Sequence, residues 1–268
     1  MTMKPGELGL AISCAMVFYL MACLASLLRR RAFGNALFAL GFATTFAAVT
    51  IRWMQVSHLP LQSMFEIFLC LGMLMFPLSL LMERVAAVET RGEKTSDPVS
   101  AALAFALLFP AAFIFKAEPQ KLPPALQSWL FAPHVLSYLL SYIIFFRAGT
   151  IALAQIKTGR DEHRRIYRLA LLGFPFMTAG LILGAFWGKL AWGDYWNWDP
   201  KELWSLATWL CFLAYLHLGA GDAPASRPRW LRRVESALII CGVILIAITL
   251  IWVNLGGRFA SGLHGYAS

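Results

Sequence analysis

Apolar runs about as long as a membrane span recur along this chain of 268 residues. A helix needs roughly 20 predominantly apolar residues to cross the hydrocarbon core of a bilayer. Such windows predict eight spans, near residues 7–28, 33–55, 61–82, 98–115, 134–156, 169–191, 203–219 and 235–255. The runs are continuous, whereas the strands of a β-barrel alternate apolar and polar residues. We therefore expect residues 1–268 to form a single transmembrane domain, an all-α polytopic bundle.

Positive charge is distributed unevenly between the predicted loops. The chain has 23 Lys and Arg against 14 Asp and Glu, a net charge of +9. Fifteen of the basic residues lie in 29–31, 84–94, 157–168 and 227–233, and the segments that alternate with these hold seven. Loops rich in Lys and Arg stay on the cytoplasmic side. The pattern predicts both termini outside, and it explains the charge without a nucleic-acid partner.

Membrane insertion does not explain the predicted external loop at 187–204, between spans six and seven. Six of the ten tryptophans lie in the 23 residues from Trp187 to Trp209. An interfacial belt, the alternative interpretation, would spread its tryptophans over many loops. Indoles offer flat apolar faces and N–H donors, which suit a large planar ligand such as a porphyrin. The predicted binding residues are Trp192, Gly193, Asp194, Trp196, Trp198, Asp199, Pro200, Glu202 and Trp204.

The same loop ends in a helix start. Asp199 fits the N-cap position, Pro200 the first helical position and Glu202 the third. Asp199 and Pro200 therefore have two alternative roles, capping the seventh span and shaping the ligand site, and the sequence favours neither.

The sequence WGDYWNWDPKELW at 192–204 resembles the WWD signature of haem-handling cytochrome c assembly proteins. With the continuation DPKELWSLATWL, the eight spans and the external C-terminus, the chain is similar to the CcsA type from about His134 onward. The resemblance implies haem b as ligand, a CcsB (ResB-like) membrane partner, and a place in the bacterial inner membrane with a periplasmic active face. It also implies apocytochrome c as substrate, and a thioredoxin-like thiol reductant is a further candidate partner.

By this resemblance the chain is a subunit of a cytochrome c synthase of the haem lyase type, active only with its partner. The attacking thiols belong to the CxxCH motif of the apocytochrome, so no catalytic residue is expected in this chain. Two alternatives within the superfamily have no ligase activity: a CcmC-like haem-delivery protein and a HemX-like haem-binding regulator. A solute transporter is an alternative from another class, and it would purify without haem.

Three histidines are candidate ligands of haem iron, which takes axial imidazoles. His134 opens the fifth span and His264 lies in the tail, both on the side of the Trp-rich loop, so we predict a bis-His site there. The resemblance implies the same. His217 lies 14 residues beyond Leu203, roughly 21 Å deeper, and cannot share that iron. The resemblance implies that it holds haem within the membrane, with a second ligand from the partner. Interfacial or helix-end histidines are the alternatives.

The remaining charged and imidazole groups have simpler interpretations. Arg52 is expected to pair with Glu66, because charges in spans usually face the bundle interior with a partner. Arg147, midway along the fifth span, is a candidate contact for a haem propionate in transit. We expect a structural role for His58, and a solvated side chain for His163, which stands among charged residues.

Overall fold

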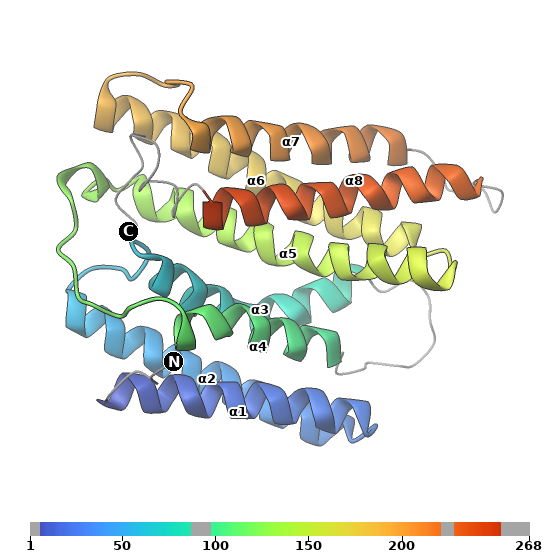
Figure 1. Cartoon of the computed structure of the whole chain (residues 1–268), viewed down its shortest axis with the longest axis horizontal. Coiled ribbons are helices and arrows are strands. Elements are labelled where there is room, and N and C mark those ends of the chain that lie inside the picture. Colours follow the sequence, from blue (N-terminus) through green and yellow to red (C-terminus); the bar gives the residue numbers. More distant parts are fainter. Residues whose placement is uncertain (1–5, 87–97, 221–227, 253–268) are drawn as a thin grey trace. The chain divides into compact units, whose positions relative to one another are not determined.

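The computed structural model describes residues 6–86, 98–220 and 228–252, and the regular structure in these ranges is helical. The helices are α1 (Gly6–Leu27), α2 (Arg31–Val56), α3 (Met64–Ala86), α4 (Pro98–Phe113), α5 (Phe131–Thr158), α6 (His163–Trp192), α7 (Pro200–Gly219) and α8 (Arg229–Ala247) (Figure 1). A 3₁₀ turn at Pro124–Leu126 and a π turn at Ile248–Trp252 complete these elements. Each predicted span corresponds to one helix, which confirms the all-α polytopic fold.

Six of the described helices are long and apolar enough to cross a membrane: α1, α2, α3, α5, α6 and α8 with part of its π turn. The helix α4 is apolar but has 16 residues, fewer than the roughly 20 that a span needs. The helix α7 has 20 residues and begins with a polar turn that includes Lys201 and Glu202.

Several helices begin before the apolar windows that predicted them. Helix α6 begins at His163 and α8 at Arg229, each six residues earlier than its window. With 30 residues α6 is about 45 Å long, whereas the hydrocarbon core is about 30 Å thick. Apolar windows mark only the part of a helix that lipid requires to be apolar. The polar ends of these helices therefore continue beyond the predicted spans.

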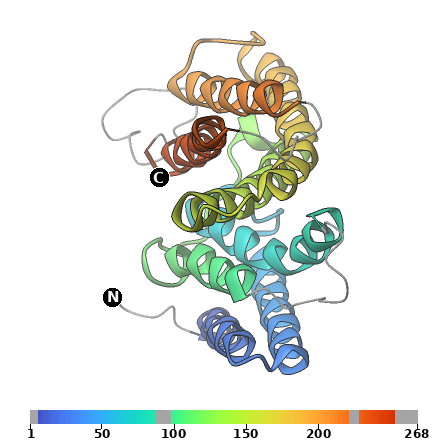
Figure 2. The ribbon, with the colours of Figure 1, turned by 90° about the vertical axis from the view of Figure 1, so that its right-hand side faces the viewer.

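The chain divides into two compact units, and the first contains α1, α2, α4 and residues 64–81 of α3. In it α1 packs against α2 and against α4 (Figure 2). The buried hydroxyl of Tyr19 donates to the carbonyl of Gly72 at 3.0 Å and lies 3.0 Å from the hydroxyl of Thr45, which links three helices. A Cβ atom at Gly41 would collide with the Tyr19 ring, so this glycine permits the close approach of α1 and α2.

The second unit contains α5, α6, α7 and α8. Helix α5 packs against α6 and α8, and α7 packs against the same two helices (Figure 1). Its core includes Phe145 and Phe212, whose rings stack with centroids 3.5 Å apart. The amide of Gln155 donates to the hydroxyl of Ser236 at 2.9 Å, a buried polar link between α5 and α8.

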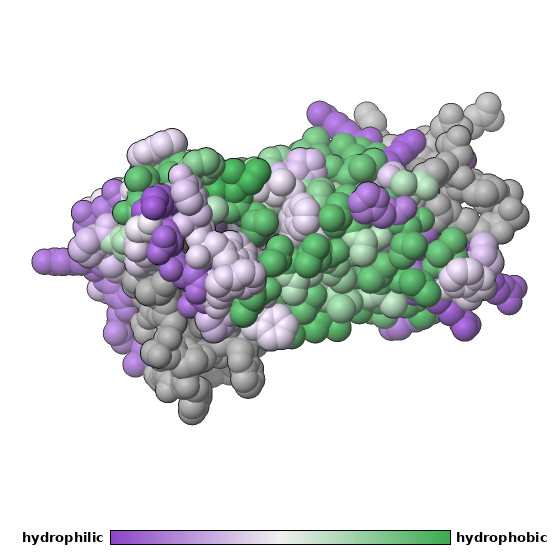
Figure 3. Space-filling view, turned by 90° about the horizontal axis from the view of Figure 1, so that it is seen from above, coloured by the Kyte–Doolittle hydropathy of each residue, from purple (hydrophilic) through white to green (hydrophobic). Residues whose placement is uncertain are grey.

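The surface matches what a bilayer requires. Apolar residues cover the middle of the face drawn in Figure 3, and hydrophilic residues gather toward its two ends. Large apolar side chains such as Ile182, Phe186 and Leu210 are about half exposed on α6 and α7. Exposed apolar surface of this extent is unusual for a soluble protein and normal against lipid tails.

Candidate functional site

His134 is held in a defined orientation at the start of α5. Its Nδ1 atom lies 2.8 Å from the carbonyl oxygen of Gly180 in α6. A carbonyl can only accept, so Nδ1 carries the proton and the lone pair of the neutral imidazole is on Nε2. Metal-binding histidines usually donate their second ring N–H to a carbonyl or carboxylate in this way. The structure thus gives His134 the tautomer that an iron ligand needs.

A chain of ring contacts joins His134 to the Trp-rich loop. The imidazole stacks on the indole of Trp187, with centroids 5.6 Å apart and planes 27° apart. Trp187 is buried and makes an edge contact at 4.8 Å with Trp192, the last residue of α6. The imidazole also makes a T-shaped contact with the ring of Tyr138, with centroids 5.2 Å apart. Contacts from α5 and α6 therefore fix this histidine.

Between α6 and α7 the loop exposes aromatic faces. Gly193 ends α6 with a φ of +92°, in the left-handed region that favours glycine. Trp198 also adopts a positive φ of +57° and is 68% exposed, with its ring 6.0 Å from that of Trp196. Tyr195 is exposed as well, and the Lys189 ammonium lies 5.5 Å from its ring centroid. The loop therefore offers indole and phenol surface together with a cation.

The two acids at the end of the loop form a capping box, as the sequence predicted. The Asp199 carboxylate accepts from the backbone N–H of Lys201 at 3.3 Å. The Glu202 carboxylate accepts from the backbone N–H groups of Asp199 at 3.1 Å and Asn197 at 2.8 Å. Pro200 occupies the first helical turn. Helix capping by Asp199 is confirmed, and a role in shaping a ligand site remains a prediction.

Two buried donor groups of this loop have no acceptor in the described part of the chain. The indole Nε1 of Trp196 and the amide Nδ2 of Asn197 are buried and have no hydrogen-bond acceptor within the described part of the chain. A buried donor left in this state costs about 1–3 kcal/mol, so an acceptor that satisfied it would be favoured. Burial lowers the pKa of Lys201 to about 8, and the charge of Asp199 acts in the opposite direction. Carboxylates of a planar ligand are suitable acceptors for the two unpaired donors.

The structure brings some predicted site residues together and separates others. His134 and Trp192 belong to one cluster, Asp194 is exposed in the loop, and Trp204 is half-buried in α7. His217 is exposed in the last turn of α7, at the other end of that helix from the loop. His264 lies outside the described residues, so its pairing with His134 stays a prediction.

Sequence reasoning missed three participants: Gly180, Gly184 and Asn197. A Cβ atom placed at Gly184 would lie 2.5 Å from the His134 ring, so this glycine makes room for the imidazole. Both glycines lie about 50 residues from His134 in the chain, and no local pattern indicates their role. Asn197 carried a weak signal, because it is an amide among tryptophans.

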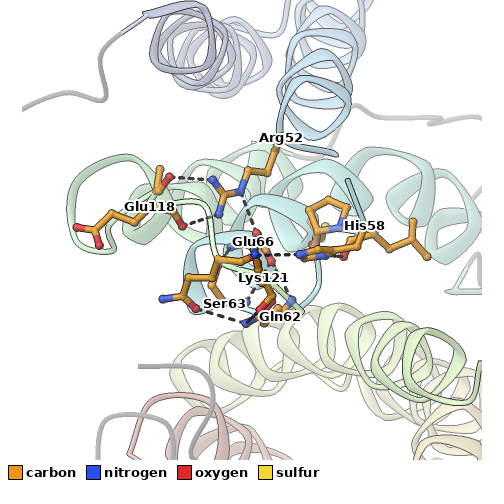
Figure 4. A network of polar contacts seen from close by, with 12 residues as sticks. Arg52, His58, Gln62, Ser63, Glu66, Glu118 and Lys121 are labelled. Atoms are coloured by element: carbon orange, nitrogen blue, oxygen red, sulfur yellow. Dashed lines mark hydrogen bonds and ion pairs between the residues drawn. The ribbon is translucent and has the colours of Figure 1, made fainter. Parts of the chain in front are cut away.

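The predicted pairing of Arg52 with Glu66 is confirmed in the first unit (Figure 4). Nε of Arg52 donates to Glu66 at 2.8 Å, and both side chains are 1–2% exposed. The other guanidinium nitrogens donate to the carbonyls of Ala117 at 2.8 Å and Glu118 at 3.0 Å. The second carboxylate oxygen of Glu66 accepts the backbone N–H of Gln62 at 2.9 Å, and also that of the next residue.

His58 and Arg147 both have polar contacts with other groups of this protein. The ring nitrogens of His58 lie 2.9 Å from the carbonyl oxygen of Leu59 and 3.2 Å from that of Gln120, contacts that fit a structural role (Figure 4). Arg147 donates to the hydroxyl of Thr150 in its own helix at 2.9 Å.

The expectation of a solvated His163 is wrong. Its side chain is 4% exposed, and Nδ1 lies 3.2 Å from a carboxylate oxygen of Glu235, which is equally buried. The ring also stacks on Tyr167 with centroids 5.6 Å apart. The charged residues that flank His163 in the sequence suggested solvent, but the partner that decides its environment comes from α8, 72 residues away.

Comparison with known proteins finds a matching family model and similar curated proteins. The family model described as "Cytochrome C assembly protein" matches residues 8–260. The "Cytochrome c biogenesis protein CcsA" of Synechococcus sp. (strain CC9605) is 28% identical over 259 residues, 82% of each chain. That of Mesostigma viride is 29% identical over 258 residues, covering 81% of this chain and 80% of the relative.

A solved structure shares the fold. The "Cytochrome c Heme Lyase CcmF" superposes with a TM-score of 0.68 over 96% of this chain, at 21% identity. This chain spans about half of that protein, 52% of its length. At this identity the likeness shows a common helical architecture.

Proposed function

The chain belongs to the cytochrome c assembly protein family, as a CcsA-type member, and from that premise we propose that it binds haem b at the Trp-rich loop. With a CcsB/ResB-like partner it then promotes thioether attachment of haem to the CxxCH motif of apocytochrome c. We place it in the bacterial cytoplasmic membrane as one multi-pass domain, with the loop on the periplasmic face.

The environment of His134 is the observation that carries this proposal. Its protonated Nδ1 faces the Gly180 carbonyl, so the nitrogen with a lone pair is the one suited to iron. The stacked Trp187 links the imidazole directly to the loop that displays further indoles. An imidazole can ligate the haem iron while the flat aromatic surface beside it contacts the porphyrin.

Each group of the loop has a role in this proposal. The exposed ring of Trp198 and its neighbours contact the porphyrin face, while the donors of Trp196 and Asn197 and the Lys201 cation bind the propionates. His134 and His264 ligate the iron until the histidine of CxxCH displaces one of them.

The protein contributes placement to the reaction. Each apocytochrome thiol adds across one haem vinyl group, so that a C–S and a C–H bond form as the S–H bond and the vinyl π bond break. Neither a leaving group nor a nucleophile from this chain is required. Holding the vinyl edge and the thiols in reacting positions is worth up to about 7–11 kcal/mol.

His217 has a separate role in the proposal. It is exposed in the last turn of α7, on the side that the charge pattern places toward the cytoplasm. We assign it to haem in transit, with the second axial ligand supplied by the partner. A position accessible from outside the bundle suits a ligand that is shared with another protein.

The experiment is the absorption spectrum of the detergent-purified chain, co-expressed with a ResB-like partner. His134→Gly and His264→Gly are compared with and without added imidazole, and His58→Gly is the matched control. We expect haem in the wild type, its loss in the first two variants, recovery with imidazole, and no change in the control. A colourless wild type, or haem indifferent to both histidines, contradicts the proposal. If haem binds but no thioether product forms with apocytochrome c, the delivery and regulator alternatives replace the synthase.

A further inference from the structure

Two glycines of α6, Gly180 and Gly184, lie one helical turn apart and face the rings of α5; we call them the glycine notch. A Cβ atom at Gly184 would lie 2.5 Å from Cε1 and 2.8 Å from Nδ1 of His134. A Cβ atom at Gly180 would lie 3.0 Å from the ring of Tyr138. The two α5 rings therefore occupy the space that side chains at these positions would take.

The notch also provides the hydrogen bond that orients the imidazole. Because α6 has no side chain here, Nδ1 of His134 reaches the Gly180 carbonyl oxygen at 2.8 Å. In a regular helix this oxygen accepts the N–H of Gly184, and its second lone pair is then the acceptor for the imidazole. Trp187 stacks on one side of the ring and Tyr138 lies edge-on to it, so rotation is restricted.

We infer that the glycine notch is a positioning element that fixes the tautomer and the ring plane of His134, so that Nε2 is the atom presented to haem iron. This rests on the proposed function, because it concerns the same ligand. Neither glycine touches the haem, and both act through the histidine. Donation of Nδ1–H to a carbonyl also raises the basicity of Nε2 as a ligand.

The test is Gly184→Ala in the complete chain, co-expressed with its partner. The new methyl group meets the far end of a side chain, so the imidazole can swing away while the helices stay in place. We expect wild-type amounts of protein with about 10-fold weaker haem retention, the usual scale for loss of an outer-shell contact. The Soret maximum and the low-spin ferric EPR signal should shift, and added imidazole should restore haem retention.

Gly173→Ala is the matched control. It lies on the same helix, and its Cβ would meet Ile144 and Phe145 of α5 at 3.1 Å. It therefore perturbs the packing of α5 against α6 without touching His134. We expect the wild-type spectrum and EPR signal from this variant.

The outcomes separate this inference from the proposed function. A colourless wild type refutes haem binding itself. A wild type with haem and a Gly184→Ala variant of unchanged retention and EPR signal refute the notch. If Gly184→Ala fails to accumulate, His134→Gly/Gly184→Ala decides, because it lacks the ring that the methyl group would meet. That double variant should accumulate like His134→Gly, and its failure to do so would also overturn the inference.

Discussion

Two polar clusters lie at helix ends that the charge pattern places outside, and they differ in how completely the chain satisfies them. Around Arg52 in the first unit, all three guanidinium nitrogens have acceptors, and both oxygens of Glu66 accept hydrogen bonds. In the Trp-rich loop of the second unit, the buried donors of Trp196 and Asn197 have no acceptor in the described residues. The Arg52–Glu66 pair is complete as a structural element, although the buried amide oxygen of Gln62 beside it has no donor in the described residues. The loop, in contrast, has N–H donors left for the carboxylates of a ligand.

The largest expected loss of stability comes from breaking the Arg52–Glu66 pair. Arg52→Met leaves the Glu66 carboxylate buried without its ion partner, which costs about 3–5 kcal/mol. We expect a large loss of stability against SDS in mixed micelles, while haem per folded protein is unchanged. Lys116→Met is the control, since its ion pair with Glu118 is exposed and should contribute little. If Arg52→Met removes haem from protein that is still folded, the contrast between the two clusters is wrong.

A second prediction concerns His163, which lies in the second unit but far from the loop. Its imidazole pairs with the buried Glu235, so His163→Ala should cost about 1–3 kcal/mol of stability. Along α6, His163 lies 24 residues from Trp187, about 36 Å. In a His217→Ala background, which lacks the second proposed haem ligand near His163, the spectrum of haem bound at the loop should therefore stay as in the wild type. Arg165→Ala, which removes the more exposed pair with Glu162, is the matched control and should barely change stability. A changed spectrum in His163→Ala would mean that the environment of the haem depends on contacts at both ends of the second unit.

These two ion pairs also show what the sequence could and could not predict. Arg52 and Glu66 were predictable partners, because each is a charge that a span tolerates only with a counterion and they lie in consecutive spans. The His163 pair was not, because its flanking charges suggested solvent and Glu235 comes from a distant helix. The eight helices followed from apolar length, but their polar extensions did not.

In the candidate site too, some features could be predicted from the sequence and others could not. The capping box of Asp199 and Glu202 was predictable, because N-caps depend on residues within one turn. The indole cluster was equally visible in the sequence. The orientation of His134 was not, because it depends on the Gly180 carbonyl, which only the packing of α6 against α5 brings close. Local chemistry could be predicted, and contacts between helices could not.

A third, smaller effect tests whether Asp199 caps the helix or also shapes the site. Asp199→Ala removes the acceptor for the Lys201 N–H and should cost about 1 kcal/mol, with some loss of haem as the loop loosens. Asp199→Asn keeps an N-cap oxygen without the charge, so both stability and haem should return. The two quantities are read from SDS denaturation and from the Soret absorbance. If Asn restores stability alone, the charge of the carboxylate contributes to haem binding, either by contact with the ligand or by keeping Lys201 protonated.

The smallest expected change in stability comes from the exposed Trp198. Asn tolerates the left-handed backbone that Trp198 adopts at φ +57°, so Trp198→Asn should preserve the turn. The lost edge contact with Trp196 is offset by lower backbone strain, and the unfolding free energy should change by less than about 0.5 kcal/mol. Haem retention should nevertheless fall roughly 2- to 10-fold, the value of one aromatic face on a planar partner.

Trp230→Asn is the control that separates ligand binding from membrane anchoring. Trp230 is 66% exposed, almost the same as Trp198 at 68%, but it lies in the first turn of α8, on the side predicted to be cytoplasmic. A general loss of an interfacial tryptophan would affect both variants alike. A loss of haem in Trp198→Asn alone would show that the external loop uses its indoles for the ligand, because membrane anchoring is removed equally in both.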